Sequence, residues 1–330
     1  GIVADPSMPR EKKLALLRAF AEIASPLLKS YAYVPASDMG TNNKEIRYML
    51  ESTGLRAVQN KAKAEENDEF YVALSVFGGA QAAAKHMNLD LSQSSLAIEG
   101  FGKVGSSVAR VFSQKGVKVV AISTVKGAIY NPDGLDVDKL IQMKNEAGED
   151  VVNSYRNVKK IEKSELLTLD VDILSPCARH HSISLKNVEK IKADIISAGA
   201  NLPVTPEAEE VLWRRRKLYL PDFITNCGGI LGTNMELAGL SEKLIGDFII
   251  REIGRKISEI IEVSEKENIS PAQIAVMEAE KKFLRIKTTS KEKSAKGRLF
   301  HMALKVYKKK LIPKWLVKLY APRFFRVRLG

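Results

Sequence analysis

The stretch from residue 95 to residue 123 constrains the fold of this chain more than any other part of it. It reads as a strand, a glycine-rich turn, a helix and a second strand, in the order SLAIE-GFGKVG-SSVARVFSQKG-VKVVAIS. The glycines Gly100, Gly102 and Gly105 have the spacing G-x-G-x-x-G. A strand, a turn of this kind and a helix in this order predict a parallel sheet that is covered by helices.

Each glycine of the turn has its own physical reason to be there. Gly100 makes a tight turn, Gly102 lets the backbone approach a pyrophosphate, and Gly105 lets the helix pack closely on the strand. The helix N-terminus offers free N–H groups and a positive dipole end to phosphates. Three glycines also occur in ordinary turns, so the flanking strand and helix are what favour a dinucleotide site. The expected contacts of this turn are Gly100, Phe101, Gly102, Lys103, Val104 and Gly105.

The rest of the pattern places this unit in a larger α/β protein. Segments 171–174, 194–197 and 219–223 read as short buried strands. Helices are expected over 10–31, 43–51, 70–87, 137–145, 185–192, after Thr205, and over about 235–285, and a short strand is expected from Tyr33. The alternation over about 95–225 predicts a doubly wound, mostly parallel Rossmann-type sheet, whose ligands gather at the carboxyl ends of the strands.

Four regions follow from these patterns. Residues 1–70 are expected to belong to a truncated α/β substrate domain, and residues 71–225 to the dinucleotide-binding domain. Residues 226–285 are expected to form C-terminal helices that close a cleft, and residues 286–330 a basic tail. With 330 residues, of which 45% are hydrophobic and 28% charged, the chain is long and apolar enough for two packed domains.

The positive charge of the chain is concentrated at its end. Residues 281–330 hold 17 of the 52 Lys and Arg residues and only one of the 39 acids, Glu292, while the rest of the chain is slightly acidic. Segment 308–326 also mixes these bases with Trp, Tyr and Phe. Such a segment is typical of binding to an anionic membrane surface or to RNA. The scarcity of acids favours a third interpretation, a disordered or artefactual extension.

Other chemistry finds little support in the residues. Cys177 and Cys227 lie far apart, which indicates a reducing compartment and small buried thiols rather than a disulfide or metal framework. His180 and His181 are adjacent but have no acidic or cysteine partner at ligand spacing, so no metal site is expected. No signal peptide and no apolar run of about 20 residues is present, and we expect a cytoplasmic protein.

Three more segments join the glycine turn to form a recognisable set. They are Val34-Pro-Ala-Ser-Asp38-Met-Gly-Thr, Gly199-Ala-Asn201-Leu-Pro-Val-Thr-Pro-Glu-Ala and Thr225-Asn226-Cys-Gly228-Gly229-Ile. Together, and in this order, they resemble the glutamate/leucine/phenylalanine/valine dehydrogenase family from Gly1 to about residue 285. The segment Lys126-Gly-Ala-Ile-Tyr-Asn-Pro-Asp-Gly-Leu-Asp136 is similar to the glutamate dehydrogenase branch.

The resemblance implies a reaction and a set of site residues. In this family a nicotinamide takes a hydride from the α-carbon of an amino acid, and water hydrolyses the imine to a 2-oxo acid and ammonia. Asp38 matches the family's catalytic Asp, a carboxylate suited to acid–base work on nitrogen. Asn201 matches an asparagine beside the nicotinamide ribose. The resemblance assigns substrate contacts to Asn226, Gly228, Gly229 and Thr233.

Each of these residues also has an ordinary structural interpretation. Asp38 is a loop carboxylate before Gly40, and Asn201 suits an Asx turn before Pro203. Gly228 and Gly229 fit a tight turn from a strand into a helix, and a threonine such as Thr233 is common on a helix surface. From the residues alone these alternatives stay open.

Departures from the family pattern are as informative as the matches. The family's catalytic lysine lies in a Lys-Gly-Gly motif, and Gly1 resembles the last glycine of it, so the chain as given is expected to be an incomplete enzyme. The family's Thr-Gly-x-Gly is replaced by Val72-Ala-Leu-Ser75, which removes a hydroxyl that holds the carboxamide. Ala198 replaces a frequent Glu. A non-catalytic dinucleotide-binding paralogue with a regulatory or subunit role is therefore the alternative function.

The end of the second strand bears on the coenzyme. Ser123 and Thr124 are expected to lie beside the coenzyme ribose, and Thr124 stands where the family often has an acid. An acid there binds the ribose 2′-OH and repels a 2′-phosphate. With Thr124 and nearby Lys126, NAD or NADP is expected, and NADP or dual use is favoured. The expected partner is an amino acid or 2-oxo acid, glutamate foremost. The family forms hexamers through its substrate domain, and assembly of this chain is left open.

Overall fold

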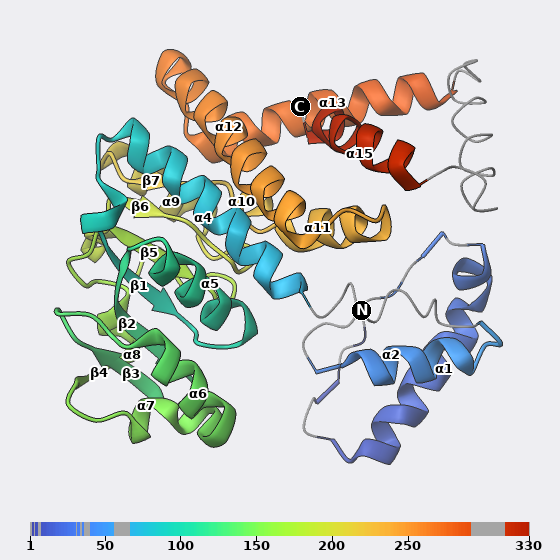
Figure 1. The fold of residues 1–330 in the computed structure, drawn as a ribbon, viewed down its shortest axis with the longest axis horizontal. Helices are drawn as coiled ribbons and strands as arrows, with labels where there is room; N and C mark the ends of the chain where they lie inside the picture. The colour runs from blue at the N-terminus through green and yellow to red at the C-terminus, as the bar shows by residue number, and fades with distance from the viewer. Residues whose placement is uncertain are drawn as a thin grey trace. The chain divides into compact units, whose positions relative to one another are not determined.

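The computed structural model describes residues 2, 4–5, 8–30, 32–33, 35, 40–55, 67–291 and 314–329. The chain divides into two compact units, Gly1–Glu66 and Asn67–Gly330 (Figure 1). The first unit contains two helices, α1 (Arg10–Lys29) and α2 (Asn43–Glu51). The second contains a seven-stranded sheet and the helices that cover it.

The sheet of the second unit has the strand order β4-β3-β2-β1-β5-β6-β7. Its strands are β1 (Ser95–Glu99), β2 (Lys118–Thr124), β3 (Gly127–Tyr130), β4 (Lys159–Ile161), β5 (Ile173–Pro176), β6 (Ile195–Ile196) and β7 (Leu218–Tyr219). The neighbouring strands β2, β1, β5, β6 and β7 pair in parallel. At the other edge, β3 pairs antiparallel with β2, and β4 pairs antiparallel with β3. The predicted doubly wound, mostly parallel sheet is confirmed.

The chain winds outward from β1 in two directions, which creates a switch point. β2 lies on one side of β1 and β5 lies on the other, and both pair with it in parallel. The connections that leave β1 and β5 therefore diverge at the carboxyl edge of the sheet. A crevice between diverging connections is the usual place for a ligand in an open α/β sheet.

Side chains of the central strands alternate between two hydrophobic layers, as a strand period of two requires. Leu96 and Ile98 of β1 join the larger layer, and Ala97 joins the smaller one. Helices α4 (Asp68–His86), α5 (Lys103–Gln114), α6 (Val137–Ala147), α7 (Val151–Ser154) and α12 (Glu242–Glu267) contribute to the larger layer. Helices α8 (Lys163–Leu166) and α9 (Pro206–Arg214) contribute to the smaller one.

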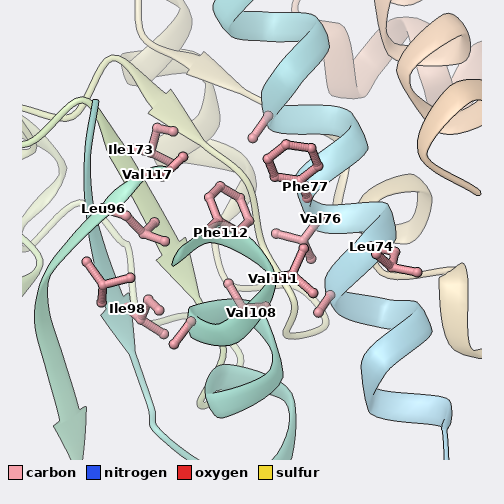
Figure 2. Close-up of a cluster of buried hydrophobic side chains, with 14 of the residues drawn as sticks. Leu74, Val76, Phe77, Leu96, Ile98, Val108, Val111, Phe112, Val117 and Ile173 are labelled. Atoms are coloured by element: carbon pink, nitrogen blue, oxygen red, sulfur yellow. The ribbon is translucent and has the colours of Figure 1, made fainter. Parts of the chain in front are cut away.

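Helix α4 packs tightly because its side chains are small. Figure 2 shows Phe77 of α4 and Phe112 of α5 close together above β1, and their ring centroids are 5.2 Å apart in an edge-to-face arrangement. On another side of α4, a Cβ placed on Gly78 would lie 2.8 Å from the carbonyl oxygen of Ile250 in α12. Residue 78 must therefore lack a side chain for α4 and α12 to approach this closely.

The helices after the sheet extend beyond the expected limit of the fold. They are α10 (Asp222–Thr225), α11 (Gly228–Leu237), α12, α13 (Pro271–Lys291) and α15 (Lys314–Leu329). The favoured interpretation of a disordered extension is wrong for residues 314–329, which form α15. Ala321 is buried in the larger layer and Phe325 packs against it, so apolar contacts fix this basic helix to the domain.

Other expected elements differ in detail. The expected helix over 185–192 is wrong, because only Val188–Lys190 forms a single 3-10 turn, η3. The described residues near Tyr33 lie outside any strand, and the edge strands β3 and β4 were not expected. Two further 3-10 turns, η1 (Leu91–Gln93) and η2 (Gly148–Asp150), connect longer elements.

The first unit has a small core of its own. Leu17, Ala21, Ala24 and Leu28 of α1 pack with Met49 of α2. Asn42 begins α2 with a capping box, because its side chain accepts from the backbone of Glu45 while that glutamate accepts from the Asn42 backbone. The catalytic candidate Asp38 lies outside the described residues. Across the described ranges, no helix combines the length and the apolar run that a bilayer span needs.

A buried carboxylate fixes α15 to α12. Glu252 is 2% exposed and receives the guanidinium groups of Arg251, Arg255 and Arg326, the last from α15 at 2.9 Å. Burial alone raises the pKa of Glu252, but hydrogen bonds from the three arginines outweigh it and hold the pKa below its usual range.

We expect Arg326→Ala to lower the free energy of unfolding by about 1 kcal/mol, because Glu252 loses one of its partners while two remain. Arg323→Ala, at an exposed position of the same helix, is the control and is expected to have a smaller effect. Urea unfolding of both variants measures the difference. Equal stability losses would contradict an anchoring role for Arg326.

Candidate functional site

The glycine turn lies at the switch point of the sheet. Gly100 follows β1 with a φ of +90°, and a Cβ there would lie 2.7 Å from the Cβ of Ala178, in the loop after β5. Glycine is therefore required twice, for its left-handed backbone and for the close approach of the neighbouring loop. The turn and the loop after β5 together form the carboxyl-edge crevice.

Helix α5 begins directly on this turn. A Cβ on Gly105 would lie only 1.8 Å from the carbonyl oxygen of Gly100, so a side chain at residue 105 would force the helix away. At Gly102, by contrast, no atom of the described residues other than its neighbours in the chain lies within 4 Å of the Cβ position. Within the described part of the chain, no side chain caps the helix N-terminus. The space over Gly102, at the start of α5, is therefore open.

Strand β2 holds the turn in this shape. The backbone N–H of Phe101 donates to the carbonyl of Ser123 at 2.6 Å, and the N–H of Gly100 donates to the Ser123 hydroxyl at 3.0 Å. Phe101 is 1% exposed and fills the core beneath the turn. Ser123 thus acts on the backbone of the turn, and its hydroxyl already has a partner.

A lysine that sequence reasoning missed lies against the turn. The Lys144 ammonium, from α6, donates to the Gly102 carbonyl at 2.7 Å and to the Ser106 hydroxyl at 2.9 Å, and lies 5.5 Å from the centre of the Phe101 ring. Burial lowers the pKa of Lys144. Because 42 residues separate it from Gly102, no local pattern indicates this contact. It adds positive charge beside the helix N-terminus.

Two asparagines meet in the segments that follow β6 and β7, Asn201 after β6 and Asn226 at the end of α10. The Asn226 amide donates to the side-chain oxygen of Asn201 at 2.6 Å and is 3.3 Å from the carbonyl of Ala200. The hydroxyl of Thr225 donates to the carbonyl of Ala198 at 2.9 Å. The structure therefore brings together the two asparagines that the resemblance assigned to neighbouring roles.

Gly228 and Gly229 are required by close packing. A Cβ on Gly228 would lie 1.9 Å from the Tyr71 carbonyl oxygen, and one on Gly229 would lie 2.1 Å from a carboxylate oxygen of Asp68. Both glycines thus let α11 begin against the first turns of α4. Their ordinary structural interpretation is sufficient to explain them.

The remaining candidates lie apart from these clusters or have internal partners. Thr124 is buried, and its hydroxyl donates to the carbonyl of Glu149 at 2.7 Å and accepts from the Lys126 N–H. Lys103 forms an exposed ion pair with Glu69 at 3.1 Å. Thr233 is half-buried on α11.

The cysteine thiols and the two adjacent histidines show neither a reactive thiolate nor a metal site in the described part of the chain. Burial raises the pKa of the Cys177 and Cys227 thiols to about 11, so both stay protonated at neutral pH. The rings of His180 and His181 contact each other edge to face. Among the residues that the structure describes, no group of three or more His, Cys, Asp or Glu side chains is arranged to hold a metal ion.

The sequence of the chain matches the model of a known protein family. The sequence model of the Glutamate/Leucine/Phenylalanine/Valine dehydrogenase family matches residues 71–289. The chain belongs to this family. The family inferred from the motifs is confirmed over residues 71–289, whereas the segment around Asp38 and helix α15 lie outside the matched residues.

Curated relatives place the chain near glutamate dehydrogenases. It is 37% identical over 243 residues to glutamate dehydrogenase of Thermotoga maritima, covering 70% of this chain and 58% of that protein. It is 33% identical over 249 residues to the NADP-specific glutamate dehydrogenase of Saccharolobus shibatae, covering 72% of this chain and 58% of that one. The chain therefore spans little more than half the length of these relatives.

Solved structures support the fold. Glutamate dehydrogenase of Plasmodium falciparum has a TM-score of 0.70 at 19% identity, covering 88% of this chain and 67% of that chain. The hetero-hexameric glutamate dehydrogenase of Thermus thermophilus has a TM-score of 0.66 at 19% identity, covering 83% and 68%.

One oxygen of a buried carboxyl group below the glycine turn lacks a hydrogen-bond partner among the described residues. Glu99, the last residue of β1, is 8% exposed, and among the described residues its Oε2 finds no hydrogen-bond partner, nor does the hydroxyl of nearby buried Ser182. Burial raises the pKa of Glu99, although the positive charge of Arg179 opposes this. A group with a raised folded-state pKa destabilises the fold as pH rises above its ordinary pKa.

We therefore expect Glu99→Gln to be more stable than the wild type at pH 7, by about 1 kcal/mol, because an amide avoids a buried charge. The advantage is expected to vanish below pH 4.5, the ordinary pKa of the group. Unfolding free energies measured from pH 4 to pH 8 test this, with exposed Glu210→Gln as the control. An advantage that does not change with pH would contradict it.

Proposed function

We propose that this chain carries the coenzyme-binding half of an NAD(P)-dependent amino acid dehydrogenase, which deaminates an L-amino acid, glutamate foremost, to a 2-oxo acid and ammonia. The main observation in support is the three-glycine turn at the switch point of the sheet. Open space lies over its Gly102, and no side chain caps the helix α5 that begins there, within the described residues. The identity of 37% to a glutamate dehydrogenase supports the choice of reaction and substrate.

The geometry of the glycine turn is suited to binding the pyrophosphate of a dinucleotide. The open space over Gly102 admits a pyrophosphate, and Gly105 keeps the helix close enough for its N–H groups to reach it. The Lys144 ammonium adds charge at the same place. A bound nicotinamide dinucleotide would accept the hydride from the α-carbon of the substrate.

The other residues have roles in binding and proton transfer. Asn201 and Asn226 lie in the segments after β6 and β7, where they are suited to orient the ribose and the nicotinamide end of the coenzyme. Asp38, which the structure does not describe, is proposed as the acid–base group on the amino nitrogen, and Thr233 as a contact of the substrate side chain. These assignments follow the family motif residue by residue.

Two glycine variants separate coenzyme binding from folding. Gly102→Ala places a methyl group in the open space, so we expect it to reduce NADH and NADPH affinity at least about tenfold while leaving the melting temperature unchanged. Gly105→Ala collides with the Gly100 carbonyl and is expected to destabilise the fold itself. Calorimetric titration and thermal melts measure both effects.

The proposed site would be refuted if the folded wild-type chain bound neither NADH nor NADPH at millimolar concentration. Gly102→Ala with undiminished coenzyme affinity would show that the pyrophosphate does not bind over Gly102.

The end of β2 favours acceptance of a 2′-phosphate. Thr124 stands where an acid would repel the phosphate, and its hydroxyl is held internally by Glu149. Lys126 is exposed two residues further on. The names of two relatives, from Saccharolobus shibatae and Halobacterium salinarum, specify NADP. We therefore propose NADP(H) or dual use.

Lys126→Glu tests this assignment. We expect it to weaken NADPH binding about tenfold and to change NADH binding less than about twofold, because only NADPH carries a phosphate for the new carboxylate to repel. Lys186→Glu, another exposed lysine, is the charge-matched control. Equal losses for both coenzymes would contradict a 2′-phosphate contact at Lys126.

The alternative function is a dinucleotide-binding paralogue without catalysis. It is favoured by Val72, which replaces the family threonine on α4 with an apolar side chain. An NAD(P)-dependent glutamate oxidation assay on the complete open reading frame separates the two functions. Coenzyme binding without turnover would support the paralogue.

A further inference from the structure

The Ser75 hydroxyl joins α4 to the segment Thr225–Gly228. Ser75 is fully buried, its Oγ lies 2.6 Å from the carbonyl oxygen of Thr225, and the backbone N–H of Gly228 donates to it at 3.1 Å. A single side chain thus contacts both ends of the segment. A serine in a helix ordinarily donates only to a carbonyl of its own helix.

The hydroxyl has one proton and two carbonyls within reach. The carbonyl of Val72, one turn back in α4, lies 2.9 Å from the Ser75 Oγ, whereas that of Thr225 lies at 2.6 Å. The shorter contact indicates that the proton goes to Thr225, while the lone pair accepts from Gly228. Ser75 therefore satisfies one buried donor and one buried acceptor of the segment.

The contact also depends on the absence of a side chain at residue 228. A Cβ on Gly228 would lie 2.5 Å from the Ser75 Oγ, so any other residue there would push the hydroxyl away. Between the two anchored ends stands Asn226, whose amide donates to Asn201 at 2.6 Å. The position of Asn226 is thus fixed by the contacts of Ser75 in α4 with Thr225 and Gly228, and by its own hydrogen bond to Asn201.

We propose that Ser75 is a positioning residue for the nicotinamide end of the coenzyme, acting through Asn226. This rests on the proposed function, which assigns Asn201 and Asn226 to that end of the coenzyme. Without the hydroxyl, the Gly228 N–H and the Thr225 carbonyl lose a buried partner, and the segment shifts to regain one. The pyrophosphate turn, held by Ser123, does not depend on this contact.

The test compares a whole coenzyme with a fragment that lacks nicotinamide. The reduced coenzyme that binds the wild type more tightly, NADH or NADPH, is titrated alongside ADP-ribose or 2′-phospho-ADP-ribose, respectively. In Ser75→Ala we expect coenzyme affinity to fall at least about fivefold and fragment affinity to change less than about twofold. A purely structural loss would weaken both ligands equally.

Two further variants complete the experiment. Ser264→Ala removes another fully buried serine hydroxyl, which donates to the carbonyl of Ile269 near the end of α12. Ser264→Ala is expected to lower the free energy of unfolding. It is expected to leave unchanged the affinity ratio, that is, the affinity for the reduced coenzyme divided by the affinity for the fragment without nicotinamide. Ser75→Cys keeps a small side chain and a weak hydrogen bond, so an intermediate ratio is expected, and it replaces Ser75→Ala should that variant fail to fold.

The outcomes are distinguishable. Wild type that binds neither ligand refutes the proposed function. Wild type that binds both, with a Ser75→Ala variant whose affinity ratio is unchanged, refutes the positioning role alone. A lowered ratio that is partly restored in Ser75→Cys supports it.

Discussion

The contact between the start of α5 and the turn after β1 is the constraint on which the site depends. At this contact, the Cβ position of residue 105 lies 1.8 Å from the Gly100 carbonyl oxygen, so only glycine permits it. With the helix this close, its N-terminal N–H groups are directed over the carboxyl edge of the sheet at the switch point. Ser123 fixes the turn from β2, and Lys144 adds a positive charge from α6. The features that suit the turn to a diphosphate thus come from four separate elements.

Helix α4 is the second element on which the arrangement depends. Its small residues allow close contacts with α12, where Gly78 meets Ile250, and with α11, where the Tyr71 carbonyl meets Gly228. Through Ser75 it also holds the segment that carries Asn226. A helix with a uniformly bulky apolar face would fill the same volume but would keep these neighbours apart. The alanine- and glycine-rich composition of α4 therefore determines how α11 and α12 pack against the sheet domain, as well as the packing of the core.

How much was predictable from the sequence depended on how local each signal was. The glycine turn and the start of α9 at Thr205 were predictable, because each depends on residues a few positions apart. The parallel sheet was predictable from the alternation of strands and helices along the chain. Lys144 and the role of Ser75 were not, because their partners lie 42 and 150 residues away. The edge strands β3 and β4 are only four and three residues long, too short for a period of two to show. Helix α15 was missed because the scarcity of acids in the tail favoured disorder, whereas Ala321 and Phe325 in fact pack on a core more than 50 residues earlier in the chain.

Hydrogen–deuterium exchange of the full chain with and without saturating NADPH or NADH tests the central claim most directly. We predict that the coenzyme slows exchange at two separated places: the turn and first helical residues at 100–106, and the segments 199–202 and 225–229. Strand β4 and helix α15 are predicted to exchange at unchanged rates. Slowed exchange elsewhere, with none at 100–106, would contradict the claim that the open start of α5 binds the diphosphate.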